Sequence, residues 1–167
     1  QWAAAAPQPP AEPILATIPG LQQRKGFLGM GAETMNMVVT PMRLILATVS
    51  QQMMKEAVAA ARNEAKAEGK GWFGQVAAQM GWMEVMCRQY ASMPPDAILA
   101  RYPGSFAIPN AYVSRIRFRE SSTDDEGRTE AAQLILDTTS GKYRFQMKGT
   151  QPREARQILR QVLPHAI

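Results

Sequence analysis

Two side chains of this chain are of types that commonly carry out covalent or acid–base chemistry, and neither stands in a setting that supports it. His165 is the single histidine and lies close to the C-terminal end, and Cys87, the single cysteine, falls on the apolar side of an expected helix. A nucleophile needs a neighbouring base, and a zinc ion needs about four ligands. We therefore expect a protein that is not an enzyme and that has no catalytic residue, no metal site and no cofactor.

Basic side chains recur at every second position in two expected strands of the C-terminal third. They alternate with apolar residues, which is the period of a strand with one buried face. These basic residues are Arg115, Arg117, Arg119, Lys142, Arg144 and Lys148. If the two strands are neighbours, the cations share one sheet face, which suits lipid headgroups or nucleic-acid phosphates. The alternative is an ordinary solvated face whose cations pair with Glu120 and Glu130.

A second candidate surface is aromatic and rich in methionine, and it lies on an expected helix over about 72–90. Its members are Trp72, Phe73, Met80, Trp82 and Met83. Most apolar residues of this helix share one third of its circumference, but Trp82 lies off that stripe. Methionine adapts its shape to different partners, so the helix is suited to contact a protein, a second copy of the chain or a membrane interface. The alternative is that the whole stripe packs within the molecule.

The spacing of apolar residues predicts strands towards both ends of the chain and helices between them. Strands are expected over 14–18 with an extension to 25, over 35–40 and 42–50 on either side of Pro41, and around 116–118, 134–136 and 143–147. Helices are expected over 51–68, 72–90 and 95–101, and an amphipathic helix over 152–163 ends the domain. Such an order, without an alternating β–α–β series, indicates an α+β fold.

Three stretches carry a resemblance to a known family. They are Val38–Leu46, then Phe106–Pro109 leading into Val113–Phe118, and then Ser140–Phe145 followed by Ala155–Leu159. These stretches resemble the pleckstrin-homology-like (PH-like) superfold in its GRAM-related prokaryotic form, and the resemblance covers residues 14–50 and 104–164. It implies a partly open antiparallel barrel of two near-orthogonal sheets capped by the C-terminal helix. A helical insertion over about 51–103 would lie between the sheets.

The resemblance implies an interaction module or adaptor without catalytic activity. It does not imply specific inositol-phosphate binding, because the phosphoinositide pattern of the eukaryotic relatives needs a lysine and then a Lys/Arg-x-Arg pair across the first hairpin. Here Arg24 and Lys25 are followed by no basic residue before Arg43, and each phosphate needs its own cationic partner.

Length, composition and charge bound the remaining possibilities. A chain of 167 residues with 46% hydrophobic residues is expected to fold as a single domain, over residues 14–164. Residues 1–13 have the Ala/Pro-rich composition of a linker, which either joins the domain to an upstream part or follows a removed leader. No apolar run approaches the roughly 18 residues of a membrane span.

The net charge of +5 favours an acidic partner. We expect a cytoplasmic module of a larger prokaryotic protein, in some settings peripheral on the cytoplasmic membrane face. Its partner would be a protein or a second copy of the chain held by the insertion helices, or an anionic membrane surface. Nucleic acid bound on the basic sheet face is the alternative.

Overall fold

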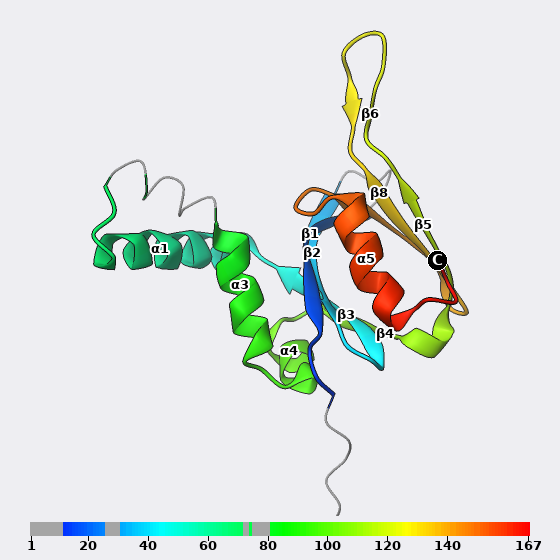
Figure 1. The fold of residues 1–167 in the computed structure, drawn as a ribbon, viewed down its shortest axis with the longest axis horizontal. Helices are drawn as coiled ribbons and strands as arrows, with labels where there is room; N and C mark the ends of the chain where they lie inside the picture. The colour runs from blue at the N-terminus through cyan, green and yellow to red at the C-terminus, as the bar shows by residue number, and fades with distance from the viewer. Residues whose placement is uncertain (1–11, 26–30, 72–73, 75–80) are drawn as a thin grey trace, which may run out of the picture.

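A seven-stranded antiparallel sheet forms the centre of the molecule (Figure 1). The computed structural model describes residues 12–25, 31–71, 74 and 81–167. The strand order across the sheet is β4–β3–β2–β1–β9–β8–β5. The strands are β1 (Ala16–Lys25), β2 (Gly31–Val39), β3 (Arg43–Val49), β4 (Phe106–Pro109), β5 (Val113–Arg119), β8 (Gln133–Thr138) and β9 (Gly141–Met147). The α+β class expected from the sequence is confirmed.

Strand β1 joins the two halves of this sheet. It pairs with β2 over most of its length and with β9 at Leu21–Met147 and Gln22–Gln146. The two separate sheets expected from the sequence are therefore two halves of one hydrogen-bonded sheet, and the sheet does not close into a barrel. The expected extension of the first strand to residue 25 is present, with an irregularity in register between Ile18 and Leu21.

The strand order shows that the sheet is strongly curved: the two strands at its opposite edges follow one another directly along the chain. Strands β4 and β5 lie at opposite edges, yet only the 3₁₀ turn η2 (Asn110–Tyr112) separates them. Seven strands in a flat sheet would place the edges about 29 Å apart. The short connection spans at most about 15 Å. The sheet therefore has an inner face, towards which it curls, and an outer face.

The C-terminal helix α5 (Pro152–Val162) covers the inner face (Figure 1). It agrees with the expected helix over 152–163, and proline in its first turn is favoured there because the missing N–H has no helical partner in any case. Its buried Ala155 and Leu159 pack in one cluster with Leu21, Leu134 and Phe145 of the sheet. Beyond the helix, the Ile116 amide of β5 donates to the Ala166 carbonyl at 2.8 Å, which fixes the tail along the edge strand.

The insertion contributes the helices α1 (Gln51–Ala67), α3 (Trp82–Ala91) and α4 (Pro95–Arg101). It leaves the sheet after β3 and returns at β4, which is the neighbour of β3. The expectation that it lies between two sheets is therefore wrong: it is inserted between adjacent strands of one half. Of the helix expected over 72–90, residues 82–90 are helical in α3, whereas residues 72, 73 and 75–80 lie outside the described part.

These helices pack on the outer face of β2 and β3. Val38, Ile45, Ala47 and Val49 point outward from the two strands and form a second buried cluster with apolar side chains of the helices. The helical members of the cluster are Ala57, Met86, Tyr90, Ile98 and Tyr102. We call this part of the outer face the covered half. Residues 35–39 of β2 and 44–49 of β3 are buried on both faces, so these stretches are mostly apolar rather than alternating, with Asn36 and Thr48 as the polar exceptions.

A buried amide ties α3 to the covered half. Asn36 of β2 is fully buried, its side-chain Oδ1 accepts from the Gly20 amide at 3.1 Å, and its Nδ2 donates to the Tyr90 hydroxyl at 3.0 Å. Burial raises the pKa of the Tyr90 phenol above its ordinary value, which keeps the hydroxyl neutral. Buried polar groups that are fully paired specify one packing arrangement, so this contact fixes the position of α3 on the sheet.

Candidate functional site

Within the described residues, no helix packs on the remaining outer face, over β5, β8 and β9, and we call it the open half. The residues expected to form a basic face lie on it. Arg115, Arg117 and Arg119 alternate along β5, Lys142 and Arg144 alternate along β9, and Lys148 follows the end of β9. The shared basic face depended on the condition that these two strands are neighbours, and they are not, because β8 lies between them. Residues paired across antiparallel strands share a face, and Arg117, Ile135 and Arg144 form one such row.

The interposed strand supplies the acidic partner of this face. Asp137 of β8 accepts from Arg117 Nη2 at 3.1 Å and lies 3.8 Å from Lys142 Nζ. The sequence analysis named Glu120 and Glu130 as partners, but no ion pair joins either to these cations within the described residues. Asp137 was not predicted as a partner, because it comes next to the basic residues of β5 and β9 only through the strand register of the folded sheet. The residues around it in the sequence give no signal of this role.

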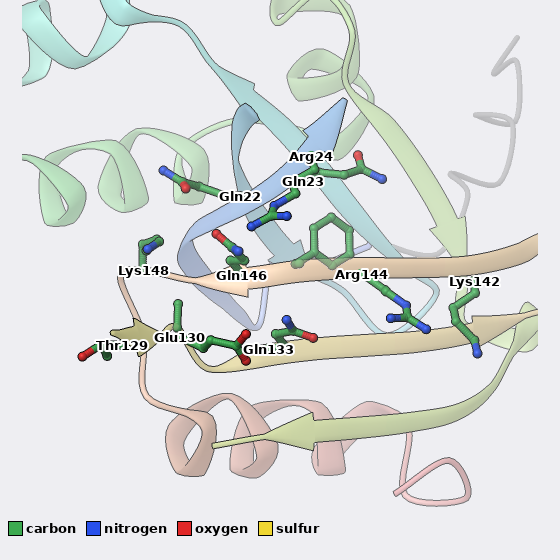
Figure 2. A pocket seen from close by; sticks show the side chains of 12 residues that line it. Gln22, Gln23, Arg24, Thr129, Glu130, Gln133, Lys142, Arg144, Gln146 and Lys148 are labelled. Carbon is green, nitrogen blue, oxygen red and sulfur yellow. The ribbon is translucent and has the colours of Figure 1, made fainter. Parts of the chain in front are cut away.

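A polar hollow of 760 Å³ lies on the open half where β9 meets β1 and β8 (Figure 2). Arg24 from β1 lies on one side of β9, Arg144 extends from β9, and Lys148 follows directly after its end (Figure 2). None of these three cations has an ion pair within the described part of the chain. The side-chain amides that line the hollow belong to Gln22, Gln23, Gln133 and Gln146. Arg24 and the glutamines were not predicted as site residues. They come close to the basic residues of β9 only because Gln22 of β1 pairs with Gln146 of β9.

The side chains that line this hollow are of types that can bind anions. Guanidinium and ammonium groups pair with phosphate or carboxylate, and the glutamine amides add neutral donors. Glu130 is the carboxylate among the lining residues, and it comes from β7 (Thr129–Glu130). This strand pairs with β6 (Ser122–Thr123) in an exposed hairpin that projects from the body (Figure 1).

The two groups considered for catalysis lie away from the hollow. Cys87 is partly buried on α3, and burial raises the pKa of its thiol, which disfavours the reactive thiolate. His165 Nε2 lies 3.2 Å from the Val113 carbonyl. Neither residue lines the hollow. Within the described residues, no three His, Cys, Asp or Glu side chains are grouped so that they could hold a metal ion.

The expected apolar surface is divided by the structure. Trp72, Phe73 and Met80 lie outside the described residues. Met83 of α3 approaches the backbone of Gly20 and Gly149, where β1 meets the end of β9, so it contacts the body of the domain. Trp82 is partly buried and packs against the second cluster beneath the insertion helices.

The function of these surfaces must be inferred from their own geometry. None of the described helices has the length and apolar character needed to cross a membrane. Comparison of the chain with protein-family models, with curated proteins and with solved structures gives no match.

Proposed function

We propose that this chain is a non-catalytic interaction module of PH-like fold that binds an anionic membrane surface through the open half of its sheet. The observation that carries the proposal is the hollow in which Arg24, Arg144 and Lys148 gather without ion pairs among the described residues. Unpaired cations on one face create a positive potential that attracts an anionic surface.

The strand order supports the PH-like part of the proposal. The chain runs through β1 to β4, turns at η2, and continues through β5, β8 and β9, so that β9 returns to pair with β1. The amphipathic helix α5 then lies across the inner face. The antiparallel strands and the single C-terminal helix across one face agree with what the resemblance implies, although the two sheets that it implies are here two halves of one hydrogen-bonded sheet.

The spacing of the cations favours a lipid surface over a single tightly held phosphate. Arg144 and Lys148 are exposed and separated along β9, and Arg24 comes from a different strand. Each basic side chain near an anionic bilayer contributes about 1 kcal/mol, so three contribute about 3 kcal/mol. Binding of this strength is reversible and sensitive to salt, which suits an adaptor on the cytoplasmic leaflet, where anionic lipids are concentrated.

Vesicle sedimentation tests the proposal. The chain should sediment with phosphatidylserine-containing vesicles in 50 mM salt, remain in the supernatant with phosphatidylcholine vesicles, and be released at about 0.5 M salt because the attraction is screened. The double variant Arg144→Glu with Lys148→Glu should lose binding. Its matched control is Arg153→Glu with Arg160→Glu, which makes the same charge change at exposed positions of α5.

The comparison between the two double variants decides the outcome. Absence of binding to phosphatidylserine vesicles in low salt would refute the proposal. Equal losses of vesicle binding in both double variants would show that binding depends on net charge and not on the open half. Tighter binding to a DNA duplex than to vesicles, with affinity falling steeply with salt, would point to the alternative nucleic-acid partner.

A further inference from the structure

A groove between α1 and the start of α3 is a second surface of the molecule, separate from the open half. It has a volume of 710 Å³, and the described residues that line it are seven residues of α1 and Trp82 of α3. The residues from α1 are Met54, Lys55, Val58, Ala59, Arg62, Asn63 and Lys66. Helix α1 runs outward from the sheet and α3 runs in a different direction (Figure 1), so one side of the groove is a helix that projects from the core.

Small residues form the buried stripe of α1 that lies beside the groove. Ala57, Ala61 and Ala65 are the buried residues of α1 and recur at intervals of four, which places them on one side of the helix. Met54 and Val58 lie beside this stripe and are partly buried. With Trp82 they form an apolar floor, and aromatic side chains in such positions are frequent anchors of protein interfaces.

Cations border this floor on the side of α1 that faces away from the buried alanines. Lys55, Arg62 and Lys66 are exposed and lie within about 40° of one another around the helix axis. None of the three has an ion pair within the described residues. The nearby carboxylates of α1 are engaged elsewhere, since Glu64 pairs with Arg88 at 3.1 Å and Glu56 accepts from Gln52 at 3.0 Å. The described residues that line the groove include no acidic side chain.

We propose that this groove docks an acidic amphipathic helix of a partner protein. An apolar floor alone would suit many occupants, but the three unpaired cations along one edge favour an occupant with negative charges on the corresponding side. Residues 54–66 extend over about 18 Å, which matches roughly three turns of a docked helix.

The arrangement specifies the sequence pattern of the partner. Apolar residues at i, i+3 or i+4 and i+7 would contact Met54, Val58 and Trp82. Glutamate or aspartate residues at the same intervals, displaced by about 100° around the partner helix, would face Lys55, Arg62 and Lys66. Docking uses none of the residues of the hollow on the open half, so it is independent of membrane binding.

Fluorescence anisotropy of a labelled peptide tests this docking. The probe is an 18-residue helical peptide with leucines on one stripe and glutamates on the adjoining flank. Two control peptides replace the glutamates by lysines or shuffle the same residues so that no apolar stripe remains. We expect saturable binding of the first peptide alone, weakened several-fold between 50 mM and 500 mM salt.

Variants locate the binding in the groove. Val58→Asp places a charge in the apolar floor and should weaken binding at least about 30-fold. Ala60→Asp, its matched control, puts the same charge on the exposed far side of α1 and should leave the affinity within about twofold. Arg62→Glu with Lys66→Glu changes only exposed positions, so it does not threaten folding, and should weaken binding about tenfold.

Every other result overturns the proposal. No binding of the acidic peptide, or equal binding to the Val58→Asp and Ala60→Asp proteins, would exclude the groove as its site. Self-association that Val58→Asp abolishes would make the occupant a second copy of the chain. Loss of vesicle binding in Val58→Asp, with vesicle binding retained in Arg144→Glu with Lys148→Glu, would make the occupant a membrane.

Discussion

The outer face of the sheet is apolar over β2 and β3 and basic over β5, β8 and β9, although both parts belong to one hydrogen-bonded sheet. In the covered half, Ile45 is fully buried beneath the insertion helices. In the open half, Arg144 also points outward from its strand, as Ile45 does, but its side chain is exposed. The difference lies in what packs on each half, because the backbone pairing continues from one to the other. The helices that pack on β2 and β3 decide which residue types these strands require, whereas the described helices leave the outer face of β5, β8 and β9 uncovered, so polar and basic residues fit there.

The largest expected effect comes from exchanging the residue types of the two halves. Ile45→Arg would bury a charge under the helices and should destabilise the fold by about 4 kcal/mol or more. Arg144→Ile, at an exposed outward position, should change the free energy of unfolding by no more than about 0.5 kcal/mol. Urea denaturation followed by circular dichroism measures both. Similar losses in the two variants would show that the halves do not differ in burial.

A medium effect is expected where α3 is tied to the covered half. Tyr90→Phe removes the hydroxyl that accepts from Asn36 and leaves a buried amide donor unpaired, which should cost about 1–3 kcal/mol. Tyr112→Phe is the control, because that side chain is 49% exposed. The difference in urea midpoint between the two variants reports the contact, and equal midpoints would mean that the hydrogen bond contributes nothing net.

Alkaline pH tests the same contact without a mutation. The folded pKa of Tyr90 is raised above its unfolded value of about 10, so the folded state favours the neutral phenol. Its contribution to stability is therefore complete below about pH 10 and is lost as the pH rises through the folded pKa. Urea midpoints between pH 8 and 11 should fall more steeply in the wild type than in Tyr90→Phe. Parallel curves would contradict this assignment.

Close packing at the junction of the halves predicts a further loss. A Cβ at Gly149 would lie 2.8 Å from the Pro19 carbonyl oxygen and 2.9 Å from the Met83 sulfur. Gly149→Ala should therefore destabilise the domain by about 1–2 kcal/mol through overpacking. Gly71→Ala introduces a Cβ with no atom within 4 Å and serves as the control. Thermal denaturation of both variants measures the difference, and an unchanged midpoint for Gly149→Ala would show that the junction relaxes freely.

The smallest effect on stability is expected in the open half itself. Asp137→Asn removes the carboxylate that pairs with Arg117 and Lys142, and partly exposed ion pairs of this kind contribute no more than about 1 kcal/mol. The same change makes the face more positive and should increase the fraction of protein that sediments with phosphatidylserine vesicles. A large loss of stability without a gain in binding would give Asp137 a structural role instead.

Local patterns predicted the elements of this fold well. Alternating apolar residues located β5, β8 and β9, and the amphipathic spacing of residues 152–163 located α5, since both periods follow from backbone geometry within a few residues. The site was predicted less completely. The basic residues of β5 and β9 were identified, but Asp137 between them was not, and neither was Arg24, because these encounters depend on strand register across the sheet.

The sequence by itself therefore determined the element types, the amphipathic face of α5 and the basic alternation of the last strands. The tertiary structure decided that the strands form one sheet, that β8 separates the two basic strands, and that the insertion covers β2 and β3 while leaving β5, β8 and β9 open. The physical reason is the range of the interactions. Periodicity records which side of an element is buried, whereas partners far apart in the sequence are set by pairing and packing that no local pattern specifies.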